Sequence, residues 1–194
     1  MDILLSTTNK NKLKELKKIF NKKNGINVST PGSGAPDVIE DKDTFKGNAL
    51  KKAIEFNRWS NKSSISDDSG LEVRSLNGAP GVYSARYFGD HPSSDVSCEG
   101  LLRMMKDKKD RRARFKTVIA MAMRGEDPII VDGVCNGHID TRIHDGRKFG
   151  YDPVFIPDGS DKAFSEMSLK EKEKYSSRAI AARKMLEKIM SANS

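Results

Sequence analysis

The sequence predicts an α/β fold built on a mixed β-sheet. Short apolar stretches typical of strands alternate with longer segments in which apolar residues recur at helical spacing. In the first such pair, a buried strand at residues 2–6 precedes a helix with Leu13, Leu16, Ile19 and Phe20 on one face. Further along, two strand-like segments are joined through the turn at residues 125–128, which predicts a hairpin. Strands joined both by helices and by tight turns are typical of a mixed sheet flanked by helices.

The remaining elements follow in chain order. The sequence predicts a helix at residues 43–59, because Phe45, Ala49, Ala53 and Phe56 recur at roughly helical spacing. Ser168 and Glu171 have the spacing of a capping box. We expect strands at 26–29, 71–73, 114–123, 129–135 and 154–156, a helix at 94–105, and a C-terminal helix that carries Ile180, Met185, Leu186 and Ile189.

Length and charge narrow the class of protein. A chain of 194 residues is long enough to bury a hydrophobic core. Because no linker or repeat divides the sequence, we expect a single domain that spans residues 1–194. Lys and Arg number 35 against 27 Asp and Glu, and a net charge of +8 favours a polyanionic partner such as a nucleotide or nucleic acid. Cys98 and Cys135 lie far apart and suggest neither a disulfide framework nor a zinc site. No apolar run approaches about 20 residues, so we expect a soluble, cytoplasmic protein without a membrane partner.

Two adjacent acids, Asp67 and Asp68, stand in the stretch SDDSGLEV at residues 66–73. Asp, Ser and Gly are ordinary turn formers, so one interpretation is a turn between two strands. The alternative is that adjacent acids at a strand end point in different directions. One would then be held by the scaffold while the other binds Mg²⁺ or deprotonates a water molecule.

A second polar stretch, residues 6–12, lies between the first strand and the first helix and contains hydroxyls, an amide and two lysines. The N-terminus of a helix favours an anion because its N–H groups and its dipole both carry positive charge. An ordinary N-cap with a solvated basic face remains the alternative. The stretch has no GxxxxGK[ST] pattern and is therefore not a Walker A loop.

Two loops combine aromatic residues with glycine and proline. Residues 78–87 hold two tyrosines and an arginine, which can present aromatic and cationic groups to a base or a phosphate. Residues 149–153 form an aromatic corner between whose rings a purine can fit. A structural turn whose tyrosines fill the core is the alternative for residues 78–87.

These motifs occur together in one order over nearly the whole chain: the polar stretch at 6–12, DDSGL at 67–71, GAPGVYSARY at 78–87, FGYDPVF at 149–155 and SSR at 176–178. In this arrangement the chain resembles the inosine triphosphate pyrophosphatase family. Members of that family hydrolyse non-standard purine nucleoside triphosphates such as ITP, dITP and XTP to the monophosphate and pyrophosphate, which cleanses the nucleotide pool. The resemblance implies an elongated two-lobed fold with a central twisted sheet and a nucleotide cleft between the lobes. It also implies Mg²⁺ as cofactor, a purine nucleoside triphosphate as partner and a homodimer.

The resemblance also implies roles for individual residues. Asp68 matches the proton acceptor and metal ligand, with Asp67 beside it and Lys52 as charge stabilisation. Glu40 is the candidate for the second metal acid. The residues expected to bind substrate are Thr7, Thr8, Asn9, Lys10, Asn11, Lys12, Ser69, Phe149, Gly150, Tyr151, Asp152, Lys172, Ser177 and Arg178.

The chain departs from the family pattern at two positions. Ser177 stands where the family usually has a histidine that helps to recognise the purine, so base discrimination is open. Gly47 stands where Glu is usual. Two alternatives follow: a hydrolase with relaxed base specificity, and a basic module that binds nucleotides or RNA without turnover. The absence of any RRM, KH, zinc-finger or basic-region signature argues against a nucleic-acid partner.

Overall fold

The computed structural model describes residues 1–21 and 25–192, and the chain divides into two compact units. Unit 1 consists of Met1–Asp68, Thr117–Gly133 and Ser177–Ser194, and unit 2 of Ser69–Lys116 and Val134–Ser176. The prediction of one domain over residues 1–194 stays a prediction.

The strands form one mixed six-stranded sheet in the order β2-β1-β3-β4-β5-β6. Strand β1 pairs in parallel with β2 and β3, whereas β5 pairs antiparallel with β6. This confirms the predicted α/β class with a mixed sheet. The strands are β1 (Asp2–Leu5), β2 (Asn27–Ser29), β3 (Ser63–Val73), β4 (Arg112–Ala122), β5 (Ile129–Ile139) and β6 (Phe155–Pro157).

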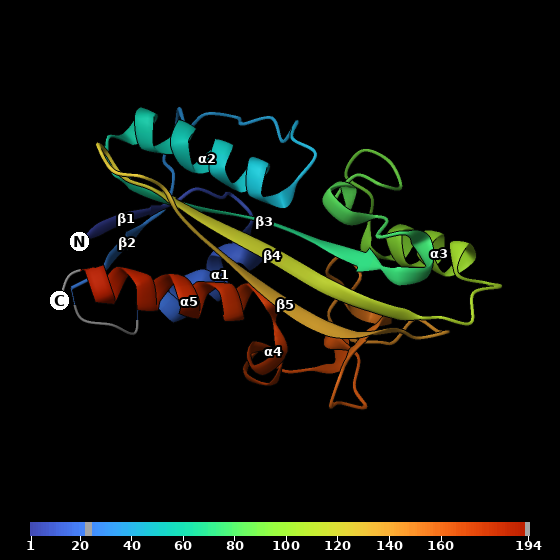
Figure 1. Cartoon of the computed structure of the whole chain (residues 1–194). Helices are drawn as coiled ribbons and strands as arrows, with labels where there is room; N and C mark the ends of the chain where they lie inside the picture. The colour runs from blue at the N-terminus through green and yellow to red at the C-terminus, as the bar shows by residue number, and fades with distance from the viewer. Residues whose placement is uncertain (22–24, 193–194) are drawn as a thin grey trace. The chain divides into compact units, whose positions relative to one another are not determined.

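Unit 1 places helices on both faces of its part of the sheet. Figure 1 shows α2 (Phe45–Ser60) over one face, while α1 (Lys10–Phe20) and α5 (Ser177–Ala192) lie side by side on the other. Helix α2 begins where the Thr44 side chain accepts from the Gly47 N–H, and it ends at Asn61 in the left-handed conformation. The core of the unit includes Ile3, Leu5, Leu16, Phe20, Ile65, Ile119 and Met185.

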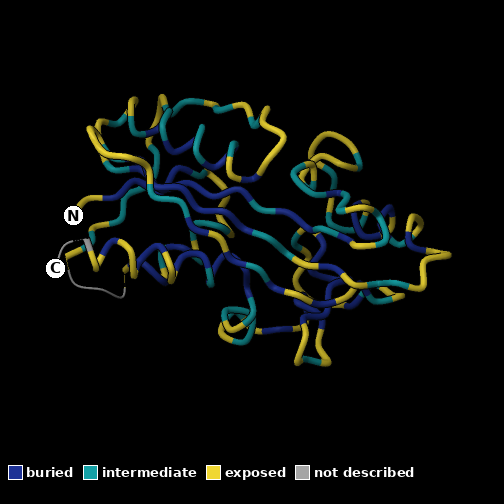
Figure 2. Tube along the Cα trace, in the orientation of Figure 1, coloured by how far each residue is buried: buried dark blue, intermediate teal, exposed yellow. Residues whose placement is uncertain are grey.

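Unit 2 packs α3 (Ser94–Met104) and α4 (Leu169–Tyr175) against its own core. The Phe155 ring lies 4.7 Å from that of Phe115 and 5.0 Å from that of Phe164, centroid to centroid. The predicted capping box of Ser168 and Glu171 is confirmed at the start of α4. Figure 2 shows the strands largely buried and the connecting loops exposed.

Both cysteines are buried and carry free thiols, as expected without a disulfide framework. Burial raises the pKa of Cys98 and of Cys135 to about 12, so neither thiol is activated at neutral pH.

The strand predicted at residues 71–73 is longer than expected. Strand β3 begins at Ser63, so Asp67 and Asp68 lie inside the strand and not at a strand end or in a turn. The polar residues that obscured the strand are buried with partners: the Ser64 hydroxyl lies 2.5 Å from that of Ser6, and the Ser66 hydroxyl donates to the Ala49 carbonyl. Side-chain hydrogen bonds therefore stabilise a strand that hydrophobic patterning does not reveal.

Strand β5 also extends beyond its predicted end, to Ile139. Val131, Gly133, Cys135, Gly137 and Ile139 are buried in alternation with more exposed residues. The next buried position after Cys135 is Gly137, which carries no apolar signal, so hydrophobic patterning does not extend the strand past Cys135.

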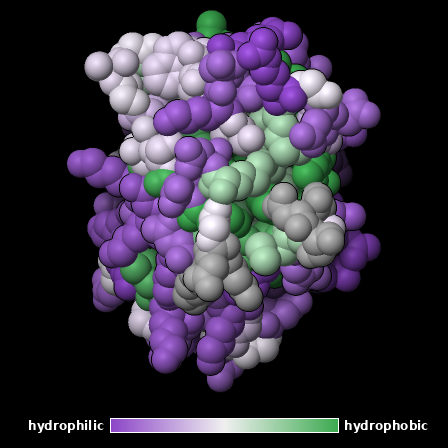
Figure 3. Space-filling view, turned by 90° about the vertical axis from the view of Figure 1, so that its left-hand side faces the viewer, coloured by the Kyte–Doolittle hydropathy of each residue, from purple (hydrophilic) through white to green (hydrophobic). Residues whose placement is uncertain are grey.

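The face drawn in Figure 3 is mostly hydrophilic with smaller apolar patches. Among the helices of residues 1–21 and 25–192, none combines the length with the apolar character that a bilayer span requires.

Candidate active site

Asp67 lies at the centre of an ionic cluster in unit 1. Its carboxylate is fully buried, and Oδ2 lies 3.0 Å from Lys12 Nζ and 3.1 Å from Arg178 Nε. Burial alone would raise the pKa of the Asp67 carboxyl, but Lys12, Arg178 and Lys52 together hold it well below its usual range. Asp67 is therefore ionised throughout the physiological pH range and holds two cations in place.

Asp68, the next residue of β3, has different partners. Asp67 contacts residues of α1 and α5, whereas Asp68 Oδ2 accepts from the Asn48 side chain of α2 at 3.0 Å. Successive side chains of a strand point to opposite faces, and these helices cover opposite faces of the sheet (Figure 1). The prediction that the paired acids diverge is thus confirmed by their contacts.

The two acids also differ in pKa. Burial, followed by the negative charge of Glu40, raises the pKa of Asp68 to about 6. The Asn48 hydrogen bond and the charges of Lys52 and Lys12 oppose that rise. A carboxylate that is ionised at neutral pH but close to protonation is suited to accept a proton.

Lys52 joins the acids to the loop that precedes α2. Its ammonium donates to the Asp67 carbonyl oxygen at 2.7 Å and forms an ion pair with Glu40. The side chains of Lys52 and Glu40 are 11% and 28% exposed, so Glu40 is the more accessible to solvent of the two. Lys52 and Glu40 are distant from Asp67 and Asp68 in the sequence. The fold places them close to these two acids, as the predicted roles require.

The polar stretch before α1 forms an N-cap. Asn9 Oδ1 accepts from the N–H groups of Asn11 at 3.0 Å and Lys12 at 3.3 Å, while Thr7 Oγ1 accepts from the Asn9 N–H at 3.2 Å. The ordinary N-cap is thus confirmed, and an anion site at the same helix end stays a prediction. Thr8, Asn9, Lys10 and Asn11 are exposed, whereas Lys12 turns toward Asp67.

The predicted base-binding residues of unit 2 form a second group. Lys172 pairs with Asp152, and its ammonium lies 5.6 Å from the Phe149 ring centroid and 5.0 Å from that of Phe164. These distances are within the range of cation–π contacts. Ser69, the first residue of this unit on β3, is half-buried.

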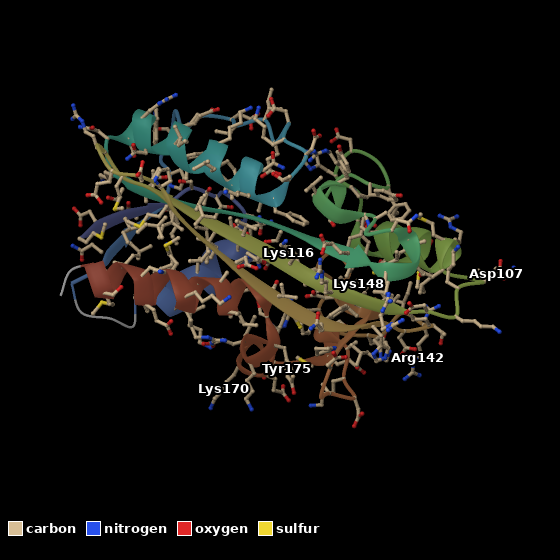
Figure 4. All side chains as sticks on the ribbon, viewed as in Figure 1. Asp107, Lys116, Arg142, Lys148, Lys170 and Tyr175 are labelled. Atoms are coloured by element: carbon tan, nitrogen blue, oxygen red, sulfur yellow. The ribbon has the colours of Figure 1, made fainter. Side chains whose placement is uncertain are left out.

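Several contacts of unit 2 hold the corner at residues 149–152. The Gly150 carbonyl, in a residue with φ of 53°, accepts from the Ser94 hydroxyl at 2.6 Å and the Cys98 thiol at 3.4 Å. The Tyr151 hydroxyl donates to the Ser84 carbonyl at 3.1 Å. Lys148, labelled in Figure 4, pairs with Asp95 at 2.8 Å. The corner is thus held on α3 and on the loop at residues 78–87.

Ser177 is directed into unit 1. It is the first residue of α5, is 6% exposed, and its hydroxyl lies 2.9 Å from that of Thr117 on β4. Ser177 thus links α5 to the sheet, and its predicted contact with substrate stays a prediction.

Two residues that contact this cluster, Glu15 and Asn48, were not predicted from the sequence. Glu15 Oε2 accepts from Arg178 Nη1 at 2.8 Å, and Asn48 contacts Asp68. A signal for both existed: Glu15 is three residues after Lys12 on the same helical face, and Asn48 is a polar residue on the apolar face of α2.

The chain is similar in sequence to dITP/XTP pyrophosphatases of other organisms. A dITP/XTP pyrophosphatase of Christiangramia forsetii is 41% identical over 187 residues, which cover 96% of this chain and 98% of that protein. A dITP/XTP pyrophosphatase of Bacillus subtilis is 37% identical, with 95% and 94% covered.

Solved structures agree. The Staphylococcus aureus Ham1 protein superposes with a TM-score of 0.88 at 34% identity, with both chains covered completely. A HAM1 protein from Coxiella burnetii gives a TM-score of 0.89 at 29% identity, with 99% of each chain covered. The Ham1 family model matches residues 3–188, and the chain belongs to the Ham1 family.

Proposed function

We propose that this chain is a nucleoside triphosphate pyrophosphatase that hydrolyses ITP, dITP and XTP to the monophosphate and pyrophosphate. The observation that supports it is the cluster in unit 1, where two adjacent buried acids have oppositely shifted pKa values and Lys12, Lys52 and Arg178 contact the first of them, Asp67. The names of the relatives agree with this activity. Lysines beside a proton acceptor suit a reaction that develops negative charge on phosphoryl oxygens.

Mg²⁺ is the cofactor that we propose, held by Asp68 and Glu40. The charge of Glu40 contributes to the raised pKa of Asp68, so the two carboxylates repel each other and a cation between them would relieve that repulsion. In the part of the chain that the structure describes, no group of three or more His, Cys, Asp and Glu side chains could hold a metal. Proteins usually bind Mg²⁺ through one or two carboxylates and substrate phosphates, and Asp68 and Glu40 would supply two carboxylates.

When bound, Mg²⁺ would supply positive charge to the phosphoryl oxygens and to the pyrophosphate leaving group. Asp68 accepts a proton from the water that attacks the α-phosphorus, and the bond between the α-phosphorus and the bridging oxygen of the pyrophosphate breaks. Lys52 and Lys12 stabilise the charge that develops on the phosphoryl oxygens, and the start of α1 from Thr7 to Lys12 holds the triphosphate. Asp67 was predicted to be catalytic, but its contacts with Lys12 and Arg178 support a positioning role.

The aromatic corner of unit 2 is our candidate for base recognition. Phe149 supplies a ring, and Lys172 and Asp152 supply a donor and an acceptor beside it. Gly150 and Tyr151 complete the corner, and its support by Ser94 suggests a preformed surface. A homodimer and a cytoplasmic location belong to the same proposal, and sedimentation would test the dimer.

The test is pyrophosphate release with Mg²⁺ from ITP, dITP, XTP, GTP, ATP and dUTP, with EDTA as control. We expect release from ITP, dITP and XTP, and loss of release in EDTA and in Asp68→Asn. Equal rates over the panel would support relaxed base specificity. Absence of pyrophosphate release from every nucleotide would refute the proposed function.

A further inference from the structure

One face of α2 holds the loop at residues 39–42. Asn48, Lys51 and Lys52 are spaced by three and four residues and therefore share a helical face. Lys51 Nζ donates to the Ile39 carbonyl at 2.9 Å and lies 3.0 Å from Asp41 Oδ1. Lys52 pairs with Glu40 between them. Every residue of this loop thus has a partner on α2, because Asn48 contacts Lys42.

Asn48 connects this loop to β3. Its side chain is fully buried, and Oδ1 accepts from the Lys42 N–H at 2.9 Å. Because a backbone N–H can only donate, the amide oxygen must face Lys42, which fixes the orientation of the amide. The amide nitrogen then donates to the Lys42 carbonyl at 3.2 Å and to Asp68 Oδ2 at 3.0 Å. One side chain thus binds both the loop that carries Glu40 and the carboxylate of Asp68.

We propose that Asn48 and Lys51 are positioning residues that set the separation between Asp68 and Glu40, so that these two acids are arranged to hold one divalent cation before substrate binds. This inference rests on the proposed function, which assigns both acids to the cation. Asn48 fixes Asp68 and the end of the loop, and Lys51 fixes the loop on the other side of Glu40. Loss of either contact removes one anchor of the loop and leaves Glu40 held through Lys52, so Glu40 can shift away from Asp68 while both carboxylates remain.

The chain offers a matched control for each residue. Asn57 also lies on α2 and donates from its amide to a backbone carbonyl, that of Lys62, at 2.8 Å. It is far along the helix from Asn48, and it contacts neither acid in any hydrogen bond of the described residues. Lys46 is an exposed lysine of α2. Replacement of Asn57 by Leu and of Lys46 by Met therefore repeats each chemical change away from the acids.

The experiment measures Mn²⁺ binding to the substrate-free protein from the electron paramagnetic resonance signal of unbound Mn²⁺. Residues that orient metal ligands typically change affinity by about 10- to 100-fold when replaced. We expect a loss in that range for Asn48→Leu and a smaller loss for Lys51→Met. Asn57→Leu and Lys46→Met should stay within about twofold of the wild type, well below that range.

Circular dichroism of each variant shows whether it is folded, and Lys51→Met keeps the test open if Asn48→Leu unfolds, because Lys51 is only partly buried. Wild-type affinity in folded Asn48→Leu and in Lys51→Met would overturn the inference, as would the absence of Mn²⁺ binding to the wild type. Binding that depends on Asn48 without pyrophosphate release would leave the inference standing and refute only the proposed function.

Discussion

The buried carboxylate of Asp67 offers a sharp test of the ionic cluster. Asp67→Asn keeps the shape of the side chain but removes its charge, which leaves Lys12 and Arg178 without their shared counter-charge. Removal of one partner from a buried ion pair typically costs about 3–5 kcal/mol. Since burial already lowers the pKa of Lys12, its deprotonation can offset part of this cost, and we expect the lower half of that range.

The assay is thermal and urea denaturation of wild type and Asp67→Asn at neutral pH. The lower half of that range, about 3–4 kcal/mol, corresponds to a decrease in Tm of about 6–16 °C in a chain of this size. Asp132→Asn, on an exposed side chain of β5, is the matched control and should leave Tm nearly unchanged. The folded-state pKa of Asp67 is depressed, so its contribution is complete above the ordinary value of 3.8 and is lost as pH falls below it. A change in stability below about 1 kcal/mol at neutral pH would refute the reasoning.

Three further predictions follow. At subsaturating Mg²⁺, kcat/KM should decrease as pH falls through about 6, because protonated Asp68 can neither accept a proton nor bind a cation; a flat pH profile there would contradict this role. Ser177→Ala should lower the free energy of unfolding in urea by about 0.5–1.5 kcal/mol, since the Thr117 hydroxyl loses a buried partner, and unchanged stability would argue against that bond. Gly133→Ala should cost about 1–3 kcal/mol or more in thermal denaturation, because a Cβ there would lie 2.1 Å from the Ser177 carbonyl oxygen and 2.7 Å from the Ala181 nitrogen; a Tm equal to that of wild type would show that α5 can shift freely.

Helices were the most predictable part of the fold. The apolar spacing of Leu16, Ile19 and Phe20 predicted α1, and the capping box of Ser168 and Glu171 was recognised although the helix α4 that it begins was not predicted. Strand β3 was underestimated because its serines and acids are buried through partners that lie far away in sequence. No local pattern carries that information.

In the candidate site, too, the sequence predicted the residues but not their long-range contacts. Residue types and order indicated Lys12, Lys52, Asp67 and Asp68, but which of them pair depends on the sheet. Arg178 is among the residues expected to bind substrate, and this stays a prediction; its guanidinium is held between Asp67 and Glu15. Glu15 and Arg178 are separated by 163 positions in the chain, so only the folded structure brings out this pair.

The position of the two acids within a strand, and not in a turn, explains how neighbours in sequence can differ in chemistry. In a turn, both carboxylates would be similarly exposed to solvent, and both would keep ordinary pKa values. In β3, alternation directs Asp67 toward Lys12 and Arg178 and Asp68 toward Asn48, so one pKa falls and the other rises. Because desolvation makes buried ion pairs a weak source of stability, the cluster is better explained by the charges it keeps in place. A strand is thus the simplest scaffold for one fixed carboxylate beside one that can exchange a proton.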